Sequence, residues 1–310
     1  MSKPLQQGQP NLYSCFDFRL RSEIALPELH PADDPADTRP VVEVRIGAVP
    51  EELPGATVRR PRIEVAGDLA LIKTPGMARY LVRGADSVTV EPVPGGSARN
   101  LRLFLLGSVV GLVAWRRGLL PLHANAIVVD GQAVAFAGNS GAGKSTLAAW
   151  FQRAGYTVLC DDVCVLRFDA DGRPMAWPGL PRLKLWGDAA DAMGHDTNAL
   201  DRVIEGKDKF SVGLAADPAL HPVPLRRLYH LARAEDTPGI VPVRGPEALR
   251  MAMEQAYRPR YPRVLGLGEE HVRRSAALVE RVELFEARRV WGFDVFEREA
   301  QAIARHLRKG

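Results

Sequence analysis

A glycine-rich stretch in the middle of the chain carries the residues best suited to chemistry. Residues 138–145 read G-N-S-G-A-G-K-S and fit the pattern G-x-x-x-x-G-K-[ST] without a mismatch. Its glycines lack a Cβ, so the backbone can wrap closely around phosphate oxygens and point successive N–H groups at them. Lys144 would add a full positive charge, and the Ser145 hydroxyl would be a ligand for Mg²⁺. The predicted phosphate-binding residues are Gly138, Asn139, Ser140, Gly141, Ala142, Gly143, Lys144, Ser145 and Thr146.

The segments on either side of this loop have the patterns of a strand and a helix. Val134–Ala137 is an apolar run that can form a buried strand, and Lys144–Arg153 has a helical composition. The N-terminus of that helix would add the positive end of its dipole to the phosphate site. The alternative is a glycine-rich turn that arose by chance, and the flanking strand and helix argue against it.

A pair of aspartates follows one helix and one strand later. Tyr156–Cys160 reads as a short buried strand, and Asp161 and Asp162 come directly after it. Carboxylates at the C-terminal end of such a strand would lie beside the phosphate loop, where open α/β sheets bind ligands. One aspartate could hold Mg²⁺, and the other could take a proton from an attacking hydroxyl. The alternative is an Asp-Asp turn on the surface.

Three further polar side chains are candidates for the same site. An Asp-Gly turn predicts a hairpin of Ala124–Val129 with Gln132–Ala137, which places His123 at the start of a neighbouring strand. Arg182 and Lys184 fall on one face of a strand and could meet nucleotide phosphates, although a solvated face explains them equally well. A lone histidine is usually structural, so the sequence leaves the role of His123 open.

Composition limits the class of protein. The chain has 310 residues, with 46% hydrophobic and 25% charged residues, which is typical of a globular protein. A net charge of +4 made of scattered arginines predicts no nucleic-acid partner. Three cysteines, too few and odd in number for a disulfide framework, favour a reducing cytoplasm. Residues 1–10 lack the apolar core of a signal peptide, and the apolar run Leu103–Trp115 is too short to span a membrane.

The chain divides into a β-rich part and an α/β part. Residues 1–97 are predicted to form a small β-rich N-terminal lobe, in which 1–10 are a loose tail. Residues 98–310 are predicted to form an α/β catalytic domain that begins with a helix from Asn100 to about Arg117. Other expected elements are a strand at Tyr13–Leu20, a strand within Trp177–Trp186, and helices at Asp188–Leu200 and Phe293–Leu307.

With these residues in view, the chain resembles the HPr kinase/phosphorylase superfamily. The resemblance rests on L-H-A-N-A-I-V-V-D-G at 122–131, G-N-S-G-A-G-K-S-T at 138–146 and C-D-D at 160–162. More closely, the chain looks like the HPr-kinase-related proteins, among them the kinases that modify ribosomal peptide precursors such as lasso peptides. It is specific over about 120–186, weaker over the N-terminal lobe and faint after 230.

The resemblance implies a P-loop kinase core similar to that of phosphoenolpyruvate carboxykinase. It implies ATP and Mg²⁺ as cofactors and transfer of the γ-phosphoryl group to a serine of a peptide or protein. Asp162 would be the general base and Asp161 would belong to the Mg²⁺ shell, an assignment that could be reversed. His123 would lie near the transferred phosphoryl group. HPr kinases also assemble, so the resemblance allows a homo-oligomer.

The chain departs from true HPr kinases in two places. Ser145-Thr146 stands where those enzymes carry Ser-Glu, and no E-x-R-G-x-G stretch follows downstream. These differences put HPr itself as substrate, and the reverse phosphorylase reaction, in doubt. The alternatives to a peptide or protein kinase are a kinase of a small-molecule hydroxyl, an ATPase or switch with water as the only acceptor, and a nucleotide-binding module without turnover. The intact Asp pair argues against the last, and no L-S-G-G-Q-like stretch supports a transporter ATPase.

Overall fold

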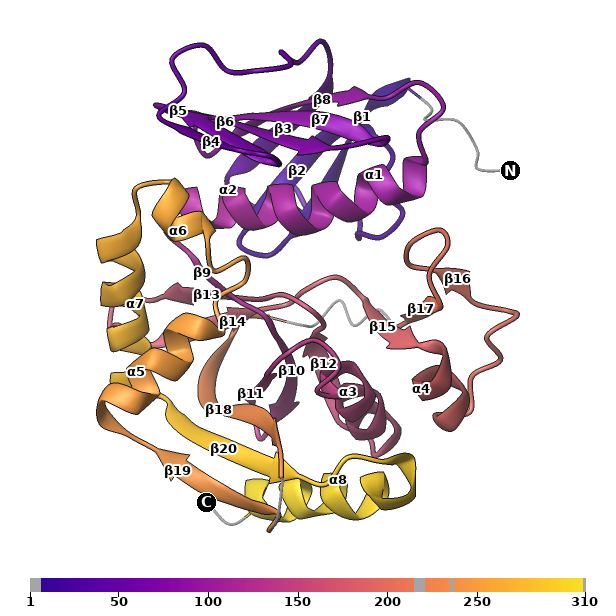
Figure 1. Cartoon of the computed structure of the whole chain (residues 1–310), viewed down its shortest axis with the longest axis vertical. Helices are drawn as coiled ribbons and strands as arrows, with labels where there is room; N and C mark the ends of the chain where they lie inside the picture. The colour runs from indigo at the N-terminus through magenta and orange to yellow at the C-terminus, as the bar shows by residue number, and fades with distance from the viewer. Residues whose placement is uncertain (1–6, 215–220, 235–236, 309–310) are drawn as a thin grey trace. The chain divides into compact units, whose positions relative to one another are not determined.

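The chain folds into two units of mixed α/β structure (Figure 1). The structure, a computed structural model, describes residues 7–214, 221–234 and 237–308. The first unit consists of Met1–Leu119, Arg202–Lys207 and Arg260–Gly268. The second consists of Leu120–Asp201, Asp208–Pro259 and Glu269–Gly310. This division differs from the predicted boundary after residue 97, because the helix that follows the N-terminal strands belongs to the unit that those strands form.

One eight-stranded sheet builds the first unit, in the order β1-β2-β3-β8-β7-β6-β5-β4. Its strands are β1 (Gln7–Cys15), β2 (Phe18–Ile24), β3 (Val41–Ile46), β4 (Val58–Arg60), β5 (Ile63–Ala66), β6 (Leu69–Thr74), β7 (Ala78–Arg83) and β8 (Ser87–Pro92). The expected strand Tyr13–Leu20 is wrong, since the chain reverses within it and β1 pairs antiparallel with β2. The expected loose tail also ends earlier than residue 10, because β1 begins at Gln7.

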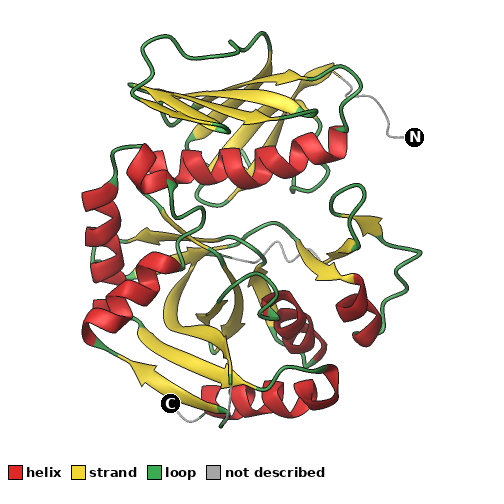
Figure 2. Ribbon diagram, in the orientation of Figure 1, coloured by secondary structure: helices red, strands yellow, loops and turns green. Residues whose placement is uncertain are grey.

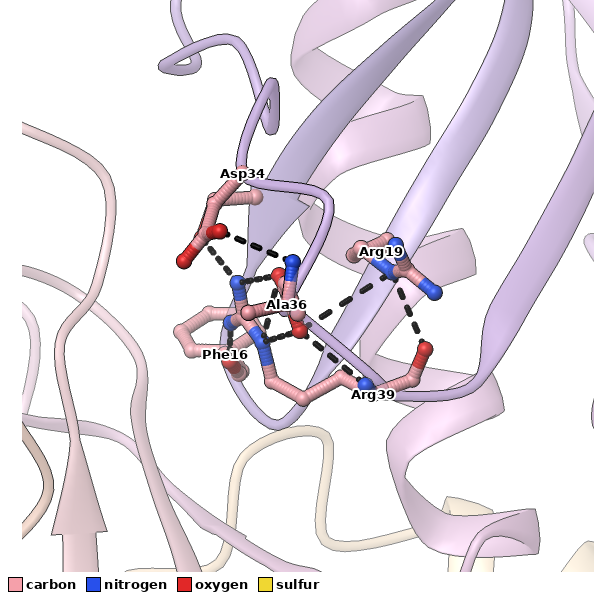
Figure 3. Close-up of polar contacts among 7 residues, drawn as sticks. Phe16, Arg19, Asp34, Ala36 and Arg39 are labelled. Atoms are coloured by element: carbon pink, nitrogen blue, oxygen red, sulfur yellow. Dashed lines mark hydrogen bonds and ion pairs between the residues drawn. The ribbon is translucent and has the colours of Figure 1, made fainter.

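An arginine fixes the β1–β2 turn to the loop that precedes β3 (Figure 3). The guanidinium of Arg39 donates hydrogen bonds to the carbonyl oxygen of Phe16 at 2.6 Å and to the hydroxyl of Ser14 at 3.0 Å. It also binds the carboxylate of Asp37, and this hydrogen bond lowers the pKa of Asp37 to about 2. Phe16 adopts a φ of 54°, so the side-chain bonds hold a turn that has no glycine.

A long apolar helix completes the first unit. It comprises α1 (Ala98–Phe104), the π-helical turn η1 (Leu105–Val109) and α2 (Val110–Arg116), and the Ser97 side chain caps its first turn. This helix has 19 residues, and its length and composition would allow it to cross a membrane. The helix extends beyond the apolar run Leu103–Trp115, which by itself was predicted to be too short for that. However, 78% of its most apolar window is buried, as expected for a core helix. Its last guanidinium, that of Arg116, donates to the carbonyl oxygens of Asp68 and Gly84 in the strand connections. The segment Arg260–Gly268 adds the short helix α6 (Tyr261–Val264) to this unit.

A mixed sheet forms the centre of the second unit. Its strands run β12-β10-β11-β18-β14-β13-β9, and β18 also pairs with β20, which pairs with β19. They are β9 (Leu120–Leu122), β10 (Ala124–Val129), β11 (Gln132–Ala137), β12 (Thr157–Cys160), β13 (Cys164–Phe168), β14 (Pro174–Trp177), β18 (Val223–Arg233), β19 (Gly239–Val243) and β20 (Glu283–Arg289). The predicted hairpin is confirmed as β10 and β11. A separate small sheet pairs β15 (Arg182–Trp186) with β17 (Lys209–Gly213), and the short strand β16 (Asp201–Arg202) completes it.

Helices flank this central sheet (Figure 2). They are α3 (Lys144–Arg153), α5 (Gly245–Glu254), α7 (Gly268–Arg281) and α8 (Phe293–Leu307). The short helix α4 (Gly187–Ala192) instead contacts β15 and β17 of the small sheet. One core cluster joins α3 and α8 to the sheet: Phe136 of β11 stacks on Phe151 of α3 at 5.4 Å, and Ile303 of α8 is buried in the same cluster. The predicted bounds of α3 and α8 are confirmed, whereas the expected helix Asp188–Leu200 ends at Ala192.

Candidate active site

Strand directions bring the predicted chemical residues to one edge of the central sheet. β11 and β18 are parallel, and so are β18 and β20. β10 is antiparallel to both β11 and β12, so β12 runs in the same direction as β11. The loop after β11, the Asp pair after β12 and the residues after β20 therefore meet at one edge. His123 joins them because it precedes the antiparallel strand β10.

The loop between β11 and α3 passes close to β18 at its first residue. Gly138 has a φ of 143°, and a Cβ there would lie 2.8 Å from the carbonyl oxygen of Leu231. The ammonium of Lys144 folds back onto the loop and donates to the carbonyl oxygens of Gly138 at 2.7 Å and Asn139 at 3.2 Å. Burial lowers the pKa of Lys144, and the two nearby aspartates oppose that shift. The loop thus holds a buried cation that two carbonyl dipoles stabilise.

A second cation holds the backbone of the loop. The guanidinium of Arg289, at the end of β20, donates to the carbonyl oxygen of Ala142 at 2.5 Å. Arg289 is 5% exposed, and burial lowers its pKa to about 10. Arg289 was not among the predicted site residues, because it lies 147 positions from Ala142 and belongs to no motif.

Asp161 connects the loop to the neighbouring small sheet. Its carboxylate accepts hydrogen bonds from the Ser145 hydroxyl at 2.9 Å and from the backbone N–H of Lys184 at 2.6 Å. The residue is 5% exposed. Burial raises the pKa of Asp161, and the adjacent Asp162 carboxylate raises it further. The positive charge of Lys184 opposes these two effects but does not cancel them.

Asp162 lies in a different environment, beside a cation. The Lys184 ammonium binds its carboxylate at 2.7 Å. Burial acts to raise the pKa of Asp162, but the positive charge of Lys184 outweighs it, so the net shift is downward. Its backbone has a φ of 70°, and its N–H donates to the side-chain oxygen of Asn125 at 3.3 Å. The two aspartates thus have pKa shifts of opposite sign.

His123 lies against Asp162. Its Nδ1 is 2.9 Å from the carbonyl oxygen of Asp162 and 3.5 Å from the carboxylate. A carbonyl oxygen only accepts, so Nδ1 carries the proton and Nε2 carries the lone pair of the neutral ring. Burial lowers the pKa of His123, and the charge of Lys144 lowers it further. The ring is therefore neutral at pH 7.

A cavity of about 310 Å³ opens among these residues. Predicted residues that line it are His123, Ser140, Gly141, Ala142, Gly143, Lys144, Ser145, Thr146, Asp162 and Lys184. Four predicted residues are not part of its lining: Gly138, Asn139, Asp161 and Arg182. The first three contact lining residues, and the predicted phosphate role of Arg182 stays a prediction. The alternation in β15 is confirmed, since Leu183 and Leu185 are buried.

The cavity also contains residues that sequence reasoning missed. They are Asn125, Leu185, Trp186, Asp188, Ala189, Lys209, Arg289, Val290, Trp291, Gly292, Phe293 and Phe296. The aromatic members had no motif to reveal them. Within the described part of the chain, no three His, Cys, Asp or Glu side chains cluster in the way that holds a metal ion.

The comparisons with known proteins find likeness among solved structures only. No protein-family model matches the chain, and no curated protein matches it. Among solved structures, the chain is similar to the Hpr(Ser) kinase/phosphatase from Coxiella burnetii, with 14% sequence identity and a TM-score of 0.32. The match covers 61% of this chain and 97% of that chain. The likeness is too low to assign this chain to a family.

Proposed function

We propose that this chain is an ATP- and Mg²⁺-dependent kinase that transfers the γ-phosphoryl group to a serine hydroxyl of a peptide or protein. One observation carries the proposal: two adjacent aspartates at the loop edge have different partners. Asp161 binds the loop hydroxyl of Ser145, and Asp162 lines the cavity beside Lys184. Phosphoryl transfer needs this division between a metal-side carboxylate and an acceptor-side carboxylate.

The metal side has the donor chemistry that Mg²⁺ prefers. A carboxylate and a hydroxyl are hard oxygen ligands, and Mg²⁺ is usually held by one or two carboxylates plus phosphate oxygens. Asp161 and Ser145 already contact each other at 2.9 Å, so little rearrangement would bring both oxygens to one ion. Mg²⁺ bound there would neutralise charge on the β- and γ-phosphates. The raised pKa of Asp161 fits such a site, because a nearby cation would favour the ionised carboxylate.

The loop supplies the phosphate contacts. The Lys144 ammonium lies among carbonyl oxygens, which a phosphate oxygen can replace as an acceptor. The burial that lowers the pKa of Lys144 also strengthens its attraction for phosphate, because fewer water molecules compete. Arg289 holds the backbone of the loop through Ala142 and leaves Lys144 to face the ligand.

The acceptor side is built around Asp162. Its lowered pKa keeps the carboxylate ionised at neutral pH, so it can accept a hydrogen bond from the serine hydroxyl and then its proton. A carboxylate of low pKa is a weak base, but phosphoryl transfer depends mainly on positioning and charge neutralisation. Lys184 orients the carboxylate at 2.7 Å, and the neutral ring of His123 packs beside it.

Label transfer tests the proposal. Purified protein, Mg²⁺ and γ-labelled ATP are incubated with an extract of its own cells, one portion depleted of small molecules and one of macromolecules. We expect a labelled peptide or protein, and its sequence would show whether it is a ribosomal peptide precursor. Asp162→Asn should keep ATP binding and reduce transfer at least about 100-fold, the typical contribution of a general base. Label only in the small-molecule portion would indicate a metabolite kinase, and label only as free phosphate would contradict kinase activity in favour of an ATPase.

A further inference from the structure

Exposed apolar side chains gather at the cavity beside the loop. Among the described residues, the large hydrophobic side chains that are exposed are Val93, Trp186, Val241, Val272, Val290, Trp291 and Phe293. Four of these seven line the cavity: Trp186, Val290, Trp291 and Phe293. Exposed apolar surface that concentrates in one cavity indicates a binding site for an apolar group.

Three of the four come from one segment, which runs from the end of β20 into the first turn of α8. The segment begins directly after Arg289, which binds the loop through Ala142, so its position relative to the loop is fixed. Gly292 has a φ of 151°, and a Cβ there would lie 2.4 Å from the carboxylate of Asp294. The positive φ favours glycine at this position, and the aromatic residues on either side of it are exposed, Trp291 by 44% and Phe293 by 50%.

The residues that line the cavity include two chemically different groups. Asp162, Lys184 and Lys209 carry charges. Beyond Arg289, the lining residues of the β20–α8 segment are Val290, Trp291, Gly292, Phe293 and Phe296, and none carries a charge. A nucleotide has the same division, because its phosphates are anionic and its base is flat and largely apolar.

We propose that the segment Val290–Phe296 binds the base of the nucleotide whose phosphates the loop holds. The inference rests on the proposed function, and it adds the surface that recognises the base. The ring of Trp291 already has the Arg233 guanidinium over it at 5.7 Å, which limits the orientations of the indole. Phe293 and Phe296 add apolar surface on the first turn of α8. Stacking on aromatic side chains tolerates any base, so the segment sets affinity more than the choice between bases.

Comparing ATP with inorganic tripolyphosphate tests the role of the segment, because the two ligands share the phosphate chain and only one has a base. Binding of each to the full chain with Mg²⁺ is measured by calorimetry. Trp291→Ala should weaken ATP about 5- to 150-fold, the range for one stacked base, and should leave tripolyphosphate unchanged. Trp291→Phe keeps an aromatic ring and should restore most of the affinity. Val272→Ala, an exposed apolar residue of α7 outside the cavity, is the matched control.

The outcomes separate this inference from the proposed function. If the unaltered chain binds tripolyphosphate as tightly as ATP, or if Trp291→Ala and Phe293→Ala both leave ATP binding unchanged, the base does not use this segment. The phosphate site would then stand without it. Equal weakening of both ligands would mean that the segment only supports the loop, and would also overturn the inference. If neither ligand binds the unaltered chain, the proposed function fails with it.

Discussion

Replacing Gly138 by alanine should destabilise the second unit more than the same change at another loop glycine. At Gly138 the new Cβ would lie 2.8 Å from the carbonyl oxygen of Leu231, a backbone atom that cannot move aside without moving β18. At Gly141 the φ is 88° and no atom lies within 4 Å of the new Cβ, so only the backbone conformation is unfavourable. A positive φ costs a residue other than glycine about 1–2 kcal/mol, and forcing an atom into a packed site adds about 1–3 kcal/mol.

These costs can be measured as melting temperatures. For a unit of this size, 1 kcal/mol corresponds to about 2–4 °C. Gly141→Ala should therefore lower the transition of the second unit by about 2–8 °C, and Gly138→Ala by about 2–12 °C more. Scanning calorimetry resolves the transition, and the shared change from glycine to alanine makes the two variants a matched pair. Equal melting temperatures would refute the close approach of the loop to Leu231.

Three further predictions concern the carboxylates and their partner. Because burial raises the pKa of Asp161, the unfolded chain loses this proton first, and stability falls as pH rises from the ordinary value of 3.8 towards the folded one. Asp161→Asn should remove this loss of stability when melting temperatures are measured across a pH series, and a variant less stable than the unaltered chain at pH 8 would contradict that expectation. The same variant should bind Mg²⁺ about 10- to 100-fold more weakly in a titration. Lys184→Met should raise the pKa of Asp162 and move the acidic limb of the pH–rate profile to higher pH, and an unmoved limb would mean that this carboxylate is not the group that titrates. Since the folded pKa of Asp162 is lowered, the ionised carboxylate stabilises the fold above pH 3.8, and this stabilisation is lost as the pH falls further. In denaturation series at pH 2–5, the stability of Asp162→Asn should therefore fall less with acid than that of the unaltered chain. An equal fall would argue against the ion pair with Lys184.

Local signals explain which elements the sequence predicted well. An Asp-Gly turn between two apolar runs predicts the hairpin of β10 and β11, and both strands have the predicted bounds. The amphipathic pattern of Phe293–Leu307 likewise gives α8, because one face of that helix packs into the core. Residues next to a motif were therefore placed correctly along the chain, and strand direction then brought them together.

Elements that depend on distant contacts were harder to predict. The reversal at Phe16 has no glycine or proline to mark it, and Arg39, a residue distant in the sequence, binds the carbonyl oxygen of this turn. The expected strand within Trp177–Trp186 is confirmed as β15, but its start at Arg182 was not predicted, and before it Gly179 packs so closely that a Cβ there would lie 2.6 Å from the Cβ of Cys160. Arg289 and the aromatic residues Trp291, Phe293 and Phe296 lie late in the chain and yet line the cavity beside the loop. No local sequence pattern predicts that these distant residues meet the loop.

The discontinuous make-up of the first unit limits how the two units can be produced separately. Its N-terminal part ends at Leu119, yet the unit also takes Arg202–Lys207 from the middle of the second unit's sequence. Glu205 in that excursion accepts a hydrogen bond from the Ser97 hydroxyl at 2.9 Å, and its N–H donates to the side chain of Asn100 at 3.2 Å. A gene truncated after Leu119 would omit these partners and leave the first turn of α1 without them. The peptide backbone passes between the units five times, so a single protease cut would not release either one, and the two halves of the gene could not be exchanged between relatives at one crossover point.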